Sequence, residues 1–200
     1  MNFFKYGEDE INYLSSKDDK LRKFIEEIGP IKREVIPDTF QALISSIVYQ
    51  QISTKAGDTV WKRLNDSLVD LTPENIIKAT DEQLRECGLS GRKVSYLKSI
   101  ALAAKNKTVD FENLHMLSDE EIIKKLVGLY GVGVWTAEML LIFSLNRMDV
   151  LSFNDLGIKK GLMKLHGLNE ISKEDFQKFK KIYSPYASVA SLYLWEICRL

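Results

Sequence analysis

Apolar residues recur at helical spacing along almost the whole chain, and this periodicity limits the possible folds more than any other feature of the sequence. Five of them trace one face of a helix at i, i+3, i+4, i+7 and i+8: Phe40, Leu43, Ile44, Ile47 and Val48. No stretch alternates cleanly between apolar and polar residues, so we expect no sheet. The pattern predicts an all-α fold with helices near 9–15, 17–28, 38–50, 53–69, 73–79, 81–87, 92–105, 119–127, 134–145, 155–165, 173–183 and 186–199.

Local signals for helix starts agree with this periodicity. Thr80 with Gln83, and Ser118 with Glu121, have the spacing of a capping box. Thr72-Pro73 places a hydroxyl cap before a proline at the first helical position. The loops between the expected helices are short, roughly 3–8 residues, as in packed helical proteins.

Composition excludes few classes of protein. A chain of 200 residues can hold one or two domains with a sizeable core. Its 45% apolar and 28% charged content is ordinary for a soluble globular protein. Lys+Arg and Asp+Glu both number 28, so the formal net charge is zero. Nucleic-acid binders usually carry a basic excess, so any DNA-binding surface here must be a local patch.

Cysteine and histidine are scarce. Two cysteines, Cys87 and Cys198, cannot form a four-thiolate zinc or iron–sulfur site, and free thiols suit a reducing compartment. With only His115 and His166 besides, we expect no metal and no cofactor for the chemistry. The N-terminus lacks the apolar core of a signal peptide, and no run approaches the roughly 18–20 apolar residues of a membrane span. These features predict a cytoplasmic protein that does not bind membranes.

The most informative segment is 119–146, in which two expected helices flank Gly128-Leu129-Tyr130-Gly131-Val132-Gly133. Glycines let the backbone turn tightly and leave its N–H groups uncovered. The next helix begins at once, so its unsatisfied N–H groups and positive dipole end point outward together. Such a turn can bind an anion, for instance a DNA phosphate, although an ordinary turn between helices has the same glycines.

The extended pattern Leu129-x-Gly131-Val132-Gly133-x-x-Thr136-Ala137 closely resembles the hairpin of the helix-hairpin-helix DNA glycosylases, with Tyr130 where that family often has proline. The resemblance covers about residues 38–200. It implies a two-lobed helical bundle in which 38–133 form a central lobe with the hairpin. Residues 1–37 and 134–200 would form the second lobe, which carries the catalytic aspartate in a cleft.

Asp155 follows Trp135 by twenty residues, a spacing similar to that between hairpin and catalytic aspartate in this superfamily. Asp155, Ile158 and Lys159 match the Asp-x-x-Ile-Lys pattern of the 3-methyladenine DNA glycosylase II group. Phe153-Asn154 replace the Pro-Asp that commonly precedes the aspartate there. A carboxylate could stabilise the positive charge that builds on deoxyribose as the N-glycosidic bond breaks. The alternative role for Asp155 is a helix N-cap, which is compatible with catalysis.

The resemblance also assigns a base pocket. The bifunctional members of the superfamily have a lysine that forms a Schiff base where this chain has Trp135, so we expect hydrolysis without strand cleavage. Trp195, ten residues after Pro185, matches the closing helix of the group. It would line the pocket beside Asp155 and stack on a cationic base. Tyr49 and Met139 complete the predicted pocket. Packing in the core is the alternative for each of these large side chains.

A second DNA-facing segment is predicted at Gln50-Gln51-Ile52-Ser53, which resembles the Gln-Gln-(Ile/Leu)-Ser segment of the family. Gln51 falls where the family places the residue that fills the gap left by a flipped base. The alternative is a polar turn capped by Ser53. The resemblance predicts contacts with DNA for Gln50, Gln51, Ser53, Gly131, Gly133, Thr136 and Lys159.

These observations predict a monofunctional DNA glycosylase of base excision repair that hydrolyses the N-glycosidic bond of flipped alkylated purines such as 3-methyladenine. Two alternatives stay open: a glycosylase for a deaminated or oxidised base, and a non-catalytic helix-hairpin-helix DNA-binding protein. The expected partner is damaged double-stranded DNA, and the expected state is a monomer.

Overall fold

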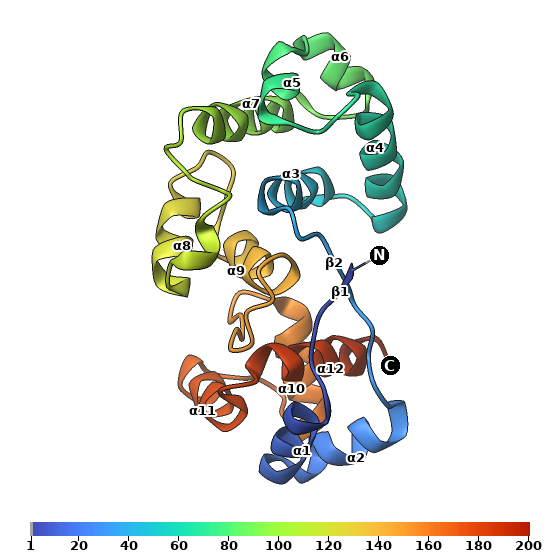
Figure 1. The fold of residues 1–200 in the computed structure, drawn as a ribbon. Coiled ribbons are helices and arrows are strands. Elements are labelled where there is room, and N and C mark those ends of the chain that lie inside the picture. The colour runs from blue at the N-terminus through green and yellow to red at the C-terminus, as the bar shows by residue number, and fades with distance from the viewer. Residues whose placement is uncertain (1) are drawn as a thin grey trace. The chain divides into compact units, whose positions relative to one another are not determined.

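The computed structural model describes residues 2–200 and is almost entirely helical (Figure 1). All twelve expected helices are present, with ends displaced by at most two residues. Their bounds are α1 Glu8–Lys17, α2 Asp19–Ile28, α3 Thr39–Tyr49, α4 Thr54–Ser67, α5 Pro73–Lys78, α6 Asp81–Glu86, α7 Gly91–Lys105, α8 Asp119–Val127, α9 Val134–Phe143, α10 Leu156–His166, α11 Lys173–Tyr183 and α12 Ala187–Arg199. None of these helices is long and apolar enough to cross a membrane.

The expectation that the chain has no sheet was wrong in detail, because the described residues include a small one. Strand β1 (Asn2–Phe3) pairs antiparallel with β2 (Glu34–Val35), with Asn2 opposite Val35. Strands of two residues are too short to show a period-two pattern, so the sequence gives no sign of them. The helical pattern also did not predict a short 3-10 helix, η1 (Leu114–Met116).

The helix starts form as the sequence predicts. The Thr80 hydroxyl accepts from the backbone N–H of Gln83, whose side chain accepts in return from the backbone N–H of Thr80. Ser118 and Glu121 form the same reciprocal pair at the start of α8. These contacts satisfy backbone donors that a helix leaves unpaired in its first turn, and they fix where α6 and α8 begin.

The chain is divided into two compact units. Unit 1 consists of the described residues up to Val35 together with Leu141–Leu200, and unit 2 is Ile36–Leu140. In unit 2, α3 packs on α4 and α7, and α5 and α6 also pack on α7. The rings of Phe40 and Phe111 meet edge-to-face at 5.6 Å, and the Thr39 hydroxyl donates to the Phe111 carbonyl at 2.7 Å. These contacts anchor the start of α3 in the core of unit 2.

The core of unit 1 is built on α12, which packs most extensively against α10. Every residue from Ala187 to Leu194 is buried. A Cβ on Gly161 would lie only 2.2 Å from the carbonyl oxygen of Leu194, so only glycine permits this approach of the two helices.

A polar cluster joins three parts of unit 1 around Asp18, which lies between α1 and α2. Asp18 Oδ1 accepts from the backbone N–H groups of Lys20 and Leu21 and so caps α2. Its Oδ2 accepts from the Tyr183 hydroxyl at 2.7 Å and lies 3.2 Å from His166 Nε2. Burial raises the pKa of Asp18, but the hydrogen bonds with His166 and Tyr183 outweigh it and lower the pKa to about 2.

We predict that Asp18→Asn lowers the free energy of unfolding at pH 7 by about 2 kcal/mol, the equivalent of the lowered pKa. Because the folded pKa lies below the ordinary value of 3.8, this stabilisation is present above pH 3.8 and is lost as the pH falls towards 2. Urea unfolding followed by circular dichroism at pH 7 and pH 3 measures the difference.

The matched control is Asp66→Asn, which removes an exposed carboxylate paired with Lys62 along α4. Its effect should stay below about 0.5 kcal/mol at either pH. Equal effects of the two substitutions at pH 7 would show that the charge of the Asp18 carboxylate does not stabilise the fold.

Candidate functional site

Asp155 is the N-cap of α10 and is buried, with 7% of its surface exposed. Its Oδ1 accepts from the backbone N–H of Ile158 at 2.8 Å. The loop that precedes α10 is fixed on α12, where the Ser188 hydroxyl accepts from the backbone N–H of Val150 and the Ser191 hydroxyl donates to the Val150 carbonyl. The capping role of Asp155 is therefore observed, and its carboxylate has a defined position.

Trp195 holds the same carboxylate from the neighbouring helix. Its indole Nε1–H donates to Asp155 Oδ1 at 3.0 Å, so this oxygen receives two N–H donors. The indole is half-buried and lies against the ring of Phe143, with 5.5 Å between the ring centroids. The sequence predicted Trp195 as a base-stacking residue, and the hydrogen bond to Asp155 is a contact that sequence reasoning missed.

Gly157 makes this hydrogen bond sterically possible. A Cβ at this position would lie 2.8 Å from Trp195 Cδ1 and 3.1 Å from Asp155 Oδ1. Together with Gly161 one turn later, it leaves a strip of α10 without side chains where α12 approaches. The Gly-x-x-x-Gly spacing on an expected helix is a signal in the sequence for this close approach.

The hairpin between α8 and α9 contains three glycines, and two of them, Gly131 and Gly133, have different surroundings. Gly131 has φ +86°, and a Cβ there would lie 2.4 Å from the ring of Tyr96. The fold itself therefore requires glycine at this position. Gly133 is exposed, and a Cβ there would meet no atom within 4 Å. Its carbonyl accepts the backbone N–H of Ala137, so the open face of Gly133 adjoins the first turn of α9.

The Gln50-Gln51 segment directly follows α3 and is tied to this hairpin. Gln50 Nε2 donates to the carbonyl oxygen of Gly131 at 3.2 Å. Gln51 is exposed and has φ +56°, a left-handed conformation that non-glycine residues rarely adopt. Ser53 caps α4 by accepting from the backbone N–H of Ala56, which is the structural alternative predicted for this residue.

The remaining predicted pocket residues lie in different environments. Trp135 is exposed over 41% of its surface, whereas Met139 on the same helix is buried. The Tyr49 hydroxyl donates to Asp58 at 2.6 Å, and its ring covers Gly57. Burial and the Asp58 carboxylate raise the pKa of Tyr49 to about 12.

Two of the predicted DNA contacts, Thr136 and Lys159, differ in exposure: Thr136 is buried and Lys159 is partly exposed. Thr136 is buried, with 3% of its surface exposed, so a direct contact of its hydroxyl with a DNA strand does not fit its position. The Lys159 ammonium lies over the ring of Phe153, 4.6 Å from the centroid. This cation–π contact holds the side chain of Lys159, in the first turn of α10, against the loop that precedes the helix.

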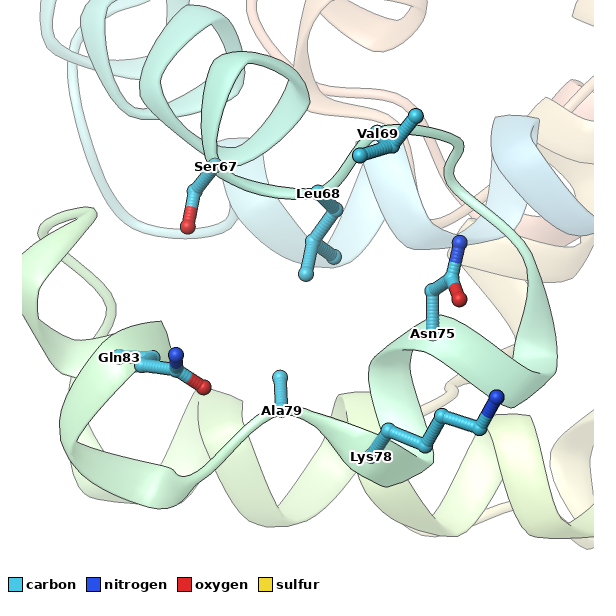
Figure 2. A pocket seen from close by; sticks show the side chains of 7 residues that line it. All are labelled: Ser67, Leu68, Val69, Asn75, Lys78, Ala79 and Gln83. Carbon is cyan, nitrogen blue, oxygen red and sulfur yellow. The ribbon is translucent and has the colours of Figure 1, made fainter.

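An open concavity elsewhere in unit 2, of about 260 Å³, lies apart from all of these residues in the sequence (Figure 2). Two of its polar side chains bond to the backbone: Asn75 Nδ2 donates to the Asp70 carbonyl, and Gln83 Oε1 accepts from the backbone N–H of Thr80 at the start of α6. The lining residues are Ser67, Leu68, Val69, Asn75, Lys78, Ala79 and Gln83. None of them is a catalytic candidate. Among residues 2–200, no three His, Cys, Asp or Glu side chains gather into a potential metal site.

Comparison with known proteins agrees with the motifs. Residues 44–185 match the family model described as HhH-GPD superfamily base excision DNA repair protein. The chain is 35% identical over 196 residues to DNA-3-methyladenine glycosylase 1 of Schizosaccharomyces pombe, an alignment that covers 94% of this chain and 86% of the relative.

Solved structures are similar over nearly the whole chain. A DNA-3-methyladenine glycosidase from Bacillus halodurans superimposes with a TM-score of 0.86 at 35% identity, covering 99% of this chain and 93% of the other. The S. pombe 3-methyladenine DNA glycosylase Mag1 in complex with abasic DNA superimposes with a TM-score of 0.85 at 33% identity, covering 96% and 98%. The predicted helical fold and the predicted resemblance are both confirmed by these similarities.

We predict that Gly157→Ala displaces the Trp195 indole from Asp155, because the added methyl group has no room beside either side chain. The indole N–H resonance of Trp195, assigned by its loss in Trp195→Phe, should move in a nitrogen-proton correlation spectrum. The free energy of unfolding should fall by about 1–3 kcal/mol, as for other overpacked sites.

Gly7→Ala is the control, since the nearest atom to its added Cβ is Glu10 Oε2 at an ordinary 3.7 Å. That variant should leave the Trp195 resonance unchanged. An unmoved resonance in Gly157→Ala would mean that the hydrogen bond does not depend on the glycine.

Proposed function

This chain belongs to the HhH-GPD superfamily of base excision DNA repair proteins, and from that premise we propose that it is a monofunctional DNA glycosylase that releases alkylated purines such as 3-methyladenine. One observation carries the proposal within this chain: a buried carboxylate, Asp155, is held at Oδ1 by two N–H donors at the spacing expected after the hairpin. The relatives named as 3-methyladenine glycosylases support the choice of substrate class.

The proposed chemistry uses Asp155 as a fixed negative charge. As the bond between C1′ and the purine nitrogen breaks, its electron pair leaves with the base and positive charge builds on the deoxyribose. The carboxylate stabilises that charge, and a water oxygen then bonds to C1′ and loses a proton. An alkylated purine that carries a positive charge departs as a neutral base, so the reaction needs no strong general acid.

Trp135 supports a reaction that ends with the abasic sugar. A glycosylase that also cleaves the strand needs an amine that attacks C1′ and forms a Schiff base. An indole has no such nucleophile, and Trp135 occupies the position of the lysine in bifunctional relatives. The proposed products are therefore the free base and an intact abasic strand.

Two segments of unit 2 are proposed to hold the DNA. The open face of Gly133 at the start of α9 gives a phosphate access to backbone N–H groups and to the positive end of the helix dipole. Gln51 is proposed to fill the stack after the damaged base has flipped out. Damaged bases unstack at lower cost than normal ones, so flipping itself contributes to selectivity.

Release of free bases from duplexes that each carry one defined lesion tests the proposal. Release of methylated purines, with an intact strand and no borohydride-trapped protein–DNA complex, is the expected result. Release of only deaminated or oxidised bases would refute the substrate class. No release from any lesion would refute the glycosylase proposal as a whole.

We predict that Asp155→Asn retains the fold and DNA binding but lowers single-turnover base release by about 10²–10³, the usual cost of losing one preorganised electrostatic group. Asparagine can still cap α10 and accept from the Trp195 indole through its amide oxygen, so this change isolates the charge. Asp66→Asn serves as the exposed control. Near-normal release by Asp155→Asn would exclude Asp155 from the central role.

We also predict that Gly133→Ala weakens binding to damaged and undamaged DNA by the same factor, roughly tenfold, as for one hydrogen bond to a charged group. A phosphate contact carries no base information, so both duplexes should lose equally in fluorescence anisotropy. Because the added methyl group meets no protein atom within 4 Å, the free energy of unfolding should change by no more than about 1 kcal/mol, which is the cost of a weaker helix cap. Unchanged affinity for both duplexes would remove Gly133 from the interface.

A further inference from the structure

One face of α7 supports both DNA-facing segments of unit 2. Lys93 and Tyr96 are separated by three residues, so they project from the same side of the helix. Lys93 Nζ donates to the Val48 carbonyl at 2.7 Å, in the last turn of α3. The Tyr96 ring fills the space beside Gly131 and meets Tyr130 edge-to-face at 4.7 Å. The end of α3 and the hairpin are thus fixed on a common support.

The Lys93 contact is internal to the protein. Its ammonium lies at the carbonyl end of α3, where the helix dipole favours a positive charge. Burial lowers the pKa of this lysine, in keeping with its partly enclosed position. We therefore interpret Lys93 as a support for the end of α3 and not as a phosphate ligand.

Gln50 links the two supported segments directly. It caps the end of α3, and its Nε2–H donates to the Gly131 carbonyl across 81 positions of sequence. That carbonyl belongs to the peptide between Gly131 and Val132, so its orientation influences the adjacent N–H groups of the hairpin. On the other side, Gln50 immediately precedes Gln51, whose backbone has φ +56°.

We propose that Gln50 is a positioning residue that couples the two DNA-facing segments, so that phosphate binding at the hairpin and insertion of Gln51 into the base stack occur as one event. The inference rests on the proposed function and adds to it a residue that acts by positioning its neighbours. An amide suits the task because it donates to a carbonyl without adding charge. A carboxylate at position 50 would instead face the Gly131 oxygen with a second acceptor.

The test is a double-substitution cycle on single-turnover excision, with the methylated purine that the wild-type chain releases. Each variant is measured on a duplex with the lesion in a stable pair and on one with the lesion opposite an abasic-site analogue. Gln50→Leu should slow excision of the paired lesion about tenfold, the upper range for one hydrogen bond, and that of the unpaired lesion less than about twofold. Gln50→Glu should be slower than Gln50→Leu on the paired lesion.

The decisive comparison is with Gln51→Ala. If Gln50 acts through Gln51, adding Gln50→Leu to Gln51→Ala should slow excision of the paired lesion by less than about twofold, since interacting positions are non-additive. Gln177→Leu, on the exposed face of α11, is the matched control and should leave excision unchanged. Gln50→Ala provides a second truncation in case leucine is poorly accommodated, and thermal unfolding of every variant identifies losses due to instability.

The outcomes separate the coupling from the proposed function. Additive effects of the two substitutions, or equal losses on paired and unpaired lesions, would overturn the coupling while base release and the Asp155→Asn result still stand. If the wild-type chain releases no base, the proposed function is refuted and the coupling is refuted with it. A loss in Gln50→Leu that is matched by the loss of folded protein would also overturn the coupling.

Discussion

The close approach of α10 and α12 is the contact on which the arrangement around Asp155 depends. Gly161 lets the Leu194 backbone come so near that no side chain fits between the helices, and Gly157 then leaves room for the next residue, Trp195. At this separation the indole N–H reaches the Asp155 carboxylate, which already caps α10. Without the two glycines, α12 would lie further away and the carboxylate would lose one of the two donors at Oδ1. A packing constraint thus determines the position of a charged group.

Glycines in unit 2 allow a similar argument, because their surroundings separate structural from ligand-related roles. Gly131 is explained by its left-handed backbone and by the ring of Tyr96, so its presence says nothing by itself about DNA. Gly133 has neither a positive φ nor a neighbour within 4 Å of an added Cβ. A glycine without a role in folding weakens a helix start, since better caps exist. Under the proposed function, close approach of a phosphate to the backbone would account for it.

The sequence predicted the helices because their signals are local: an apolar period, capping boxes and a proline at a first turn. The hairpin and the Asp155 cap followed from motifs of the same short range. The features that the sequence did not predict depend on contacts between residues far apart in the chain. The Trp195–Asp155 hydrogen bond joins positions 40 residues apart, and the Gln50–Gly131 bond joins positions 81 apart. The burial of Thr136 is likewise a tertiary result. Lys159 and Phe153 are only six positions apart, but no motif in the sequence predicts their stacking.

The N-cap role of Asp155 does not by itself explain why this position holds a carboxylate. Most of the other helices here are capped by Ser or Thr, for instance at Ser53, Ser118 and Ser172, and these caps are exposed. A neutral cap satisfies the backbone as well as a carboxylate does, while a buried charge costs free energy. Asp18 is also an aspartate cap with little exposure, and its Oδ2 lies beside His166. Because a hydroxyl accepts the backbone N–H as well, capping alone does not distinguish a carboxylate from a hydroxyl at position 155. Under the proposed function, the positive charge that develops on the deoxyribose makes that distinction, because a fixed negative charge stabilises it and a hydroxyl does not.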